Sequence, residues 1–204
     1  ASVGNGVLNP SEEEINTYVK AWQEYLDEGH TVLKFVPASG AASRMFKNLF
    51  EYIEDGKKTD FIEKFLAEKD RFAFGLELRG LDEQAAVNHL LKDMNYGNLP
   101  KGLLLFHSYE DGARTPALEH LVEGAMYASS KGEVNIHFTV SHEHLPLFQA
   151  HIAEHLSTYE AKLGVKFHVS YSEQKPSTDT LAANPDGTPF RTPDGKLLFR
   201  PGGH

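Results

Sequence analysis

The sequence predicts an α/β fold in which a mostly parallel sheet lies between helices, in three α/β/α layers. Two observations support this prediction. Apolar, β-branched runs alternate along the 204-residue chain with segments whose apolar residues recur at helical spacing, as in successive β-α-β units. The connections are long enough for helical crossovers, which are right-handed, and we expect their helices to cover both faces of the sheet.

Local signals place the individual elements. Ser11 and Glu14 form a capping box at the start of a helix over 11–28, and Thr115 followed by Pro116 is a favourable start for a helix reaching residue 126. The apolar spacing predicts the other helices at 45–55, 61–66, 85–94 and 145–163. Strands are predicted at 31–36, 99–106, 134–140, 165–172 and 197–200.

We expect one domain over 1–204. Residues 1–30 would be a helical extension, and the turn-rich segment 177–200 a hairpin-like insertion on the sheet.

Composition narrows the classes of function. The formal net charge of −9 argues against a nucleic-acid-binding or membrane-surface protein, although a local basic pocket is compatible with it. The chain has no cysteine, so disulfides, thiolate chemistry and cysteine-ligated metals are excluded. No apolar run is long enough to span a bilayer, and a cytoplasmic location is expected.

The stretch PASGAASRMFK (37–47) follows a predicted strand and precedes a predicted helix. Small residues allow backbone N–H groups to approach an anion, and the positive end of the following helix favours phosphate. Arg44 adds a permanently charged guanidinium. The stretch matches neither the dinucleotide-binding pattern nor the Walker pattern, and a tight turn with a surface arginine is the alternative interpretation.

Four segments together resemble one family. PASGAASRMFK is similar to the signature loop of sugar-nucleotide pyrophosphorylases, and LPKGL (99–103) to their Pro-Lys element. SEQKP (172–176) resembles the segment whose glutamine reads uracil, and RPGGH (200–204) a loop that contacts base and sugar. The segments occur in that family's order. More narrowly, the sequence resembles the bacterial family DUF4301, within the UDP-sugar pyrophosphorylase-like nucleotidyltransferase superfamily.

The resemblance implies transfer of a uridylyl group from UTP to a sugar 1-phosphate, with release of pyrophosphate. Arg44 would bind the departing phosphates, and Lys101 would contact the phosphates at the reacting centre. Gln174 would bind the base, Gly202 the base or ribose, and His204 the sugar. Main-chain groups of the loop would wrap the triphosphate: Ala38, Ser39, Gly40, Ala41 and Ala42.

The resemblance also implies a Mg²⁺ ion, because divalent cations neutralise the repulsion between phosphates. The family's metal-binding carboxylate stands on a strand that would follow His204, so we expect no metal ligand within this chain. The resemblance thus implies that 1–204 is a nucleotide-binding domain from the amino-terminal part of a longer protein, with the carboxyl-terminal part of the full domain beyond His204. The 204-residue chain is therefore expected to bind nucleotide weakly at best and not to turn over.

Two alternatives remain open. His151, Glu154 and His155 form an H-x-x-E-H pattern, which is typical of some zinc hydrolases but arises readily by chance in a chain with 11 histidines. We expect no catalytic zinc there, because the two imidazoles would lie beside the buried stripe of their helix and no downstream helix supplies a third ligand. The second alternative is a non-catalytic domain that binds a nucleotide or another protein.

Overall fold

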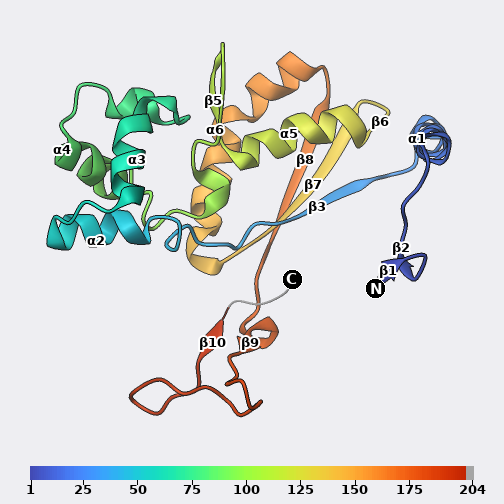
Figure 1. Cartoon of the computed structure of the whole chain (residues 1–204). Coiled ribbons are helices and arrows are strands. Elements are labelled where there is room, and N and C mark those ends of the chain that lie inside the picture. The colour runs from blue at the N-terminus through green and yellow to red at the C-terminus, as the bar shows by residue number, and fades with distance from the viewer. Residues whose placement is uncertain (201–204) are drawn as a thin grey trace.

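The structure is a computed structural model that describes residues 1–200, without the side chain of Arg200. Figure 1 shows a sheet covered by two long helices, α5 (Pro116–Tyr127) and α6 (Leu145–Leu163), beside a cluster of shorter helices. We call this cluster the helical lobe (46–98). A thin arm (175–200) leaves the carboxyl end of the sheet and extends away from both parts.

The sheet has four strands and is mostly parallel, as predicted. The central strand pairs in parallel with a strand on each side, in the registers Leu33↔Asn135 and Glu133↔Lys166, and a two-residue strand adds an antiparallel pair at its start. The strands are β3 (Leu33–Pro37), β6 (Ser129–Ser130), β7 (Glu133–Val140) and β8 (Lys166–Glu173). The strands predicted at 31–36, 134–140 and 165–172 are therefore confirmed.

One face of the sheet forms the main core. Alternate residues of β7 point to the same side, so Val134, Ile136 and Phe138 are fully buried against α5 and α6. Gly124 brings α5 close to the sheet, because a Cβ at this position would lie 2.9 Å from a methyl carbon of Val134. The helices predicted at 116–126 and 145–163 are confirmed.

The prediction of three layers was wrong for the described residues. Both sheet-covering helices lie on the same side of the sheet (Figure 1). Right-handed crossovers place successive helices on one face when the strand order does not reverse, and β3, β7 and β8 follow one another in chain order. The opposite face is polar or exposed: His137 is bonded to Ser170 and Ser172, and Phe35 is 52% exposed.

The helical lobe packs around its own apolar core, which includes Leu49, Ile62 and Leu90. The helices predicted at 45–55, 61–66 and 85–94 are confirmed, although the last one changes from α to π geometry. The lobe contains α2 (Lys47–Asp55), α3 (Asp60–Glu68), η1 (Lys69–Arg71), η2 (Gly75–Leu78), α4 (Glu83–Asn88) and η3 (His89–Asp93).

The strand predicted at 99–106 is not formed. Residues 101–103 form a 3-10 turn, η4 (Lys101–Leu103), and the only β-bridge of this segment joins Pro100 to Ala41. Proline cannot donate to a strand ladder. Gly102 packs against the buried ring of Phe148, and a Cβ at this position would lie 2.6 Å from the Cζ atom of that ring. The apolar run is therefore buried without joining the sheet.

Helix α1 (Glu12–Asp27) begins at the predicted capping box of Ser11 and Glu14. Most of its apolar side chains are exposed, Tyr18 to 55% and Val19 to 61%, whereas Leu26 near its end is buried. Trp22 donates to the Tyr127 carbonyl over 2.7 Å and so ties α1 to the end of α5. No helix among residues 1–200 combines the length and the apolar character that crossing a membrane requires.

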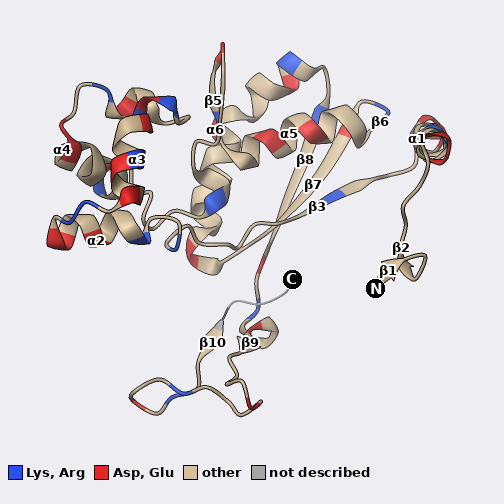
Figure 2. Ribbon diagram, viewed as in Figure 1, with Lys and Arg blue, Asp and Glu red and all other residues tan. Residues whose placement is uncertain are grey.

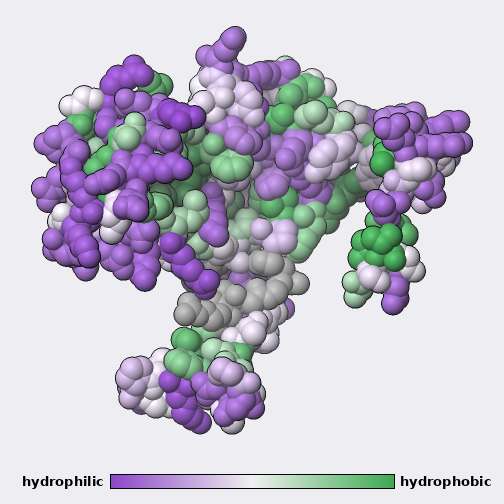
Figure 3. All heavy atoms as spheres, in the orientation of Figure 1, coloured by the Kyte–Doolittle hydropathy of each residue, from purple (hydrophilic) through white to green (hydrophobic). Residues whose placement is uncertain are grey.

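Short elements make up the periphery. Figure 3 shows apolar side chains gathered on the amino-terminal strand pair, which lies apart from the main body. In the arm, Phe199 pairs with Leu181, so its two ends meet as a hairpin. These elements are β1 (Ser2–Val3), β2 (Gly6–Val7), β4 (His107–Tyr109), β5 (Gly112–Arg114), η5 (His142–His144), η6 (Pro176–Thr178), β9 (Thr180–Leu181) and β10 (Phe199–Arg200).

Candidate phosphate-binding site

The small-residue loop after β3 lies directly against the segment that carries Lys101. The Lys101 N–H donates to the Gly40 carbonyl over 3.0 Å, and the Ala42 N–H donates to the Leu99 carbonyl over 3.3 Å. These bonds flank the bridge between Ala41 and Pro100. The two segments, about sixty residues apart in the sequence, are thus held together at the carboxyl end of β3.

A cavity of about 200 Å³ opens between these two segments. The aromatic rings of Phe138 and Phe148 form an apolar part of its wall. Lys101 brings a positive charge to a wall to which the described residues contribute no carboxylate. The complete lining is Val36, Pro37, Ala38, Gly40, Lys101, Gly102, Pro116, Ala117, His120, Phe138 and Phe148. The cavity lies where open α/β sheets commonly bind ligands.

The loop amides differ in their availability. The Ala38 N–H donates to the Thr139 carbonyl over 2.7 Å, and the Ala42 N–H is used by Leu99. Ala42 also buries its side chain completely in the core of the helical lobe. Within residues 1–200, the N–H groups of Gly40 and Ala41 have no hydrogen-bond partner. Of the loop amides, these two are therefore open to an anion.

The other expected site residues are spread more widely. Arg44 is exposed and lines none of the described cavities near the loop. The Gln174 N–H donates to the Val140 carbonyl over 2.8 Å, which places this residue at the carboxyl edge of the sheet but outside the cavity wall. Ser39 lies in the loop without lining the cavity. Gly202 and His204 lie outside the described residues.

The sequence analysis missed His120, which projects from α5 into the cavity wall. Its Nδ1 atom lies 3.2 Å from Oε2 of Glu123. The same carboxylate accepts a hydrogen bond from Lys34 of β3, which also donates to the Tyr127 hydroxyl over 2.6 Å. Lys34 keeps only 8% of its side chain exposed. The sequence signal for this network is Lys34, a charged residue at a position of β3 that faces the core.

The electrostatics of this network follow from burial and pairing. The hydrogen bond from the Lys34 ammonium lowers the pKa of the Glu123 carboxyl, which therefore stays ionised. Burial, together with the repulsion from Lys34, lowers the pKa of the His120 imidazole despite the attraction of Glu123. His120 is therefore neutral near physiological pH in the absence of a ligand.

An apolar groove of about 500 Å³ adjoins the cavity on the side of the helical lobe. Lys101 and Pro116 border both hollows, and Met45 lines the groove next to Arg44 in the sequence. Five phenylalanines, at positions 46, 61, 65, 72 and 74, contribute to the groove, and Phe106 closes it. The groove contains one basic side chain and no acidic one.

His151, Glu154 and His155 bring their ligand atoms within 4.8 Å of one another on one turn of α6. The His155 Nδ1–H donates to the His151 carbonyl over 2.9 Å, which leaves the Nε2 lone pair available. His151 Nε2 is engaged by the Thr115 hydroxyl at 2.8 Å. All three residues come from one helix, and among residues 1–200 the zinc alternative gains no ligand from a second element.

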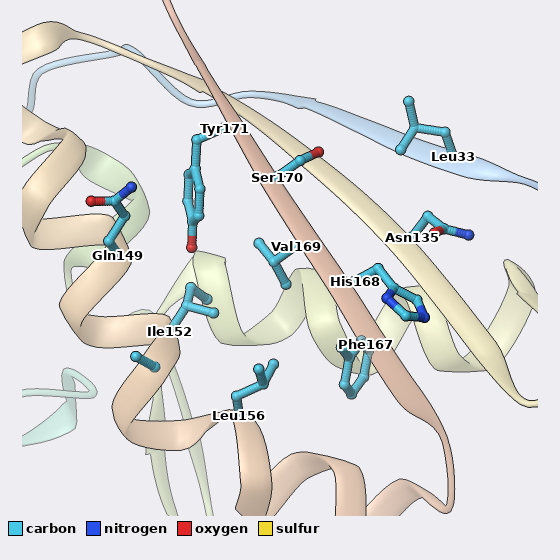
Figure 4. Close-up of a pocket in the computed structure, with 11 residues that line it drawn as sticks. Leu33, Asn135, Gln149, Ile152, Leu156, Phe167, His168, Val169, Ser170 and Tyr171 are labelled. Carbon is cyan, nitrogen blue, oxygen red and sulfur yellow. The ribbon is translucent and has the colours of Figure 1, made fainter.

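A further hollow, of about 610 Å³, is a different feature. It lies around the outer edge of β8, with Gln149, Ile152 and Leu156 on the α6 side (Figure 4). Leu33 and Asn135 lie on the other face of the sheet. Among the described residues its wall contains no lysine or arginine, and it is open along an edge of β8 that pairs with no other described strand. We therefore place the candidate site at the smaller cavity with Lys101.

The comparisons with known proteins identify the family. The family model described as a domain of unknown function, DUF4301, matches residues 1–204. The chain belongs to this DUF4301 family. No curated protein and no solved structure matches it. The narrower resemblance is thus confirmed, and the wider relation to nucleotidyltransferases remains a prediction.

Proposed function

We propose that this DUF4301 domain binds the phosphate groups of a nucleoside triphosphate in the Lys101 cavity. UTP is the nucleotide that the sequence resemblance favours, and uridylyl transfer to a sugar 1-phosphate is the proposed reaction of the full-length protein. The observation that supports this proposal best is the pairing of Lys101 with Gly40. It places the Lys101 side chain and the open Gly40 amide at the same small space, with the open Ala41 amide next to Gly40 in the loop.

Each of these groups suits a phosphate. The β-bridge between Ala41 and Pro100 holds the backbone that carries the Gly40 and Ala41 N–H groups. The loop therefore loses little conformational freedom when a ligand binds. Lys101 supplies a compact ammonium that neutralises negative charge on non-bridging oxygens. In a nucleotidyl transfer, negative charge moves onto the departing pyrophosphate, and prepositioned donors stabilise that charge.

The size of the cavity limits what it can hold. About 200 Å³ accommodates phosphate groups but is smaller than the sites that enclose whole drug-sized ligands. The base and sugar would therefore lie outside it, along the carboxyl edge of the sheet towards Gln174. The cavity wall has no carboxylate in the described residues, so it is not a magnesium site, and we assign no step to the Mg²⁺ ion expected from the resemblance.

A non-catalytic interaction domain is the second candidate. The observation that favours it is the exposed apolar face of α1, on which Ile15, Tyr18 and Val19 are between 45% and 61% exposed. Figure 2 shows acidic and basic residues mixed along the helices, and the net charge of −9 does not favour binding to nucleic acid.

Isothermal titration with pyrophosphate and with UTP tests the first proposal. Wild-type protein should bind pyrophosphate, and Lys101→Ala should weaken binding by about ten- to hundredfold, because a charge-assisted hydrogen bond is lost. Lys92→Ala is the matched control, since Lys92 is an exposed lysine outside the cavity. Equal affinities for wild type, Lys101→Ala and Lys92→Ala would contradict the proposal, as would an absence of binding.

A further inference from the structure

His120 has one nitrogen committed to the protein and one available to the cavity. The Glu123 carboxylate can only accept, so the Nδ1 atom at 3.2 Å carries the hydrogen of the neutral imidazole. The lone pair is then on Nε2, which has no hydrogen-bond partner within residues 1–200. No unpartnered side-chain nitrogen or oxygen among these residues is fully buried, so this atom is accessible.

The network behind the imidazole fixes its orientation. Lys34 holds the Glu123 carboxylate from β3, and the Tyr127 hydroxyl accepts from the same ammonium. The ring packs near Phe138, with the two centroids 6.2 Å apart. Because three elements fix the groups around His120, its imidazole is held at the cavity wall that Lys101 also borders.

We propose that the cavity binds its anion together with a proton, which Nε2 of His120 takes up from solvent. The inference rests on the proposed phosphate site and adds a second cationic donor to it. The ligand is an anion whose oxygens surround a tetrahedral central atom, such as pyrophosphate or the terminal phosphates of a nucleotide. Proton uptake forms an N–H bond on the imidazole and breaks none in the ligand.

The charges around His120 explain why the proton arrives with the ligand. In the free protein, burial and the Lys34 ammonium oppose protonation, and Lys101 faces the same cavity. The carboxylates of Glu123 and Glu119 favour protonation, but their effect is the smaller one, and the pKa of His120 stays lowered. A bound phosphate adds negative charge beside Nε2 and offsets the effect of both lysines. By linkage, the anion must then bind more tightly at lower pH.

Nuclear magnetic resonance of the wild-type protein tests this inference directly. The pKa of the His120 imidazole is measured with and without saturating sulfate, which does not titrate near neutral pH. We expect the free pKa to lie below the usual histidine value and to rise by at least about one unit on binding. Sulfate affinity should then fall about tenfold over the interval between the two pKa values.

Two variants give a second readout. In His120→Gln, affinity for sulfate should lose its dependence on pH between about 5.5 and 8. His89→Gln is the matched control, because His89 also pairs with a carboxylate, Asp93 at 2.9 Å, but lies in the helical lobe. The control should keep the wild-type pH dependence.

The outcomes separate this inference from the proposed function. If the Gly40 and Ala41 amide resonances respond to sulfate while the His120 pKa stays fixed, the site binds anions and the proton-linked role of His120 is wrong. If these amides respond to neither sulfate nor pyrophosphate at any pH, the phosphate site itself is wrong.

Discussion

The pairing of Glu123 with Lys34 permits a quantitative prediction. Glu123→Gln keeps the size of the side chain and removes the charge that compensates Lys34, whose side chain is 8% exposed. Removing one partner of a fully buried pair costs about 3–5 kcal/mol. The Glu123 side chain is 48% exposed, so water screens this pair, and we expect a loss of about 1–3 kcal/mol in the free energy of unfolding.

Lys34→Met provides the comparison. It removes the buried charge and leaves Glu123 half in contact with water, so only the hydrogen bonds of Lys34 are lost. Replacing a buried ion by an apolar residue of similar size is often close to neutral. We therefore expect Lys34→Met to destabilise the protein less than Glu123→Gln, and the double variant to be more stable than Glu123→Gln alone.

Urea denaturation followed by circular dichroism measures these differences. With a slope of about 2 kcal/mol/M, Glu123→Gln should lower the midpoint by about 0.5–1.5 M. Glu54→Gln is the control, since Glu54 is an exposed glutamate without an ion pair among the described residues. A Glu123→Gln midpoint equal to that of the control, or a Lys34→Met variant that is clearly less stable than Glu123→Gln, would refute the reasoning.

The pH dependence gives an independent check on the same pair. The pKa of Glu123 is lowered in the folded protein from the usual value of 4.5. The stabilisation is thus fully present above that value and is lost as the pH falls through the lowered folded pKa. The difference in unfolding free energy between wild type and Glu123→Gln should shrink on acidification below pH 4.5. A difference in unfolding free energy that does not change with pH would show that the charge of Glu123 is not the source of the stabilisation.

Three further changes test other parts of the structure. Gly102→Ala places a Cβ 2.6 Å from the buried ring of Phe148, so urea denaturation should show a loss of about 1–3 kcal/mol, and an unchanged midpoint would contradict this packing. Thr115→Ala removes the cap of α5 and the bond to His151, and should cost about 1–2 kcal/mol in the same assay. His151 is engaged by Thr115, and within the described part of the chain no second element adds a ligand, so we expect no catalytic zinc with His155. Elemental analysis that finds one zinc per chain, together with a hydrolytic activity, and the loss of both in His155→Ala, would overturn this.

Much of the sheet could be predicted because its signals are local. The alternation of apolar and polar residues at 134–140 indicates that one face of β7 packs against the core. Thr115 before Pro116 marks the cap of α5. The same reasoning wrongly predicted a strand for the apolar run at 99–106. Its hydrophobicity indicated burial correctly, but Pro100 lacks a donor and Gly102 packs under a ring, so burial does not require a strand.

The candidate site could be predicted only in part. The small residues of the loop and Lys101 are visible in the sequence, and the structure places Gly40 and Lys101 in hydrogen-bond contact. His120 depends on a partner from a distant strand, because the Lys34 ammonium reaches its helix across 89 positions of the chain, at Glu123. Periodicity identifies the elements that carry such residues, but it does not report which side chains meet across them.

A crystal structure with bound pyrophosphate tests the central claim most directly. The account predicts electron density for pyrophosphate in the cavity beside Lys101, with phosphate oxygens at hydrogen-bond distance, about 2.7–3.2 Å, from Lys101 Nζ and from the Gly40 or Ala41 amide nitrogen. Pyrophosphate bound elsewhere, with the Lys101 cavity empty at a concentration that saturates binding in solution, would contradict it.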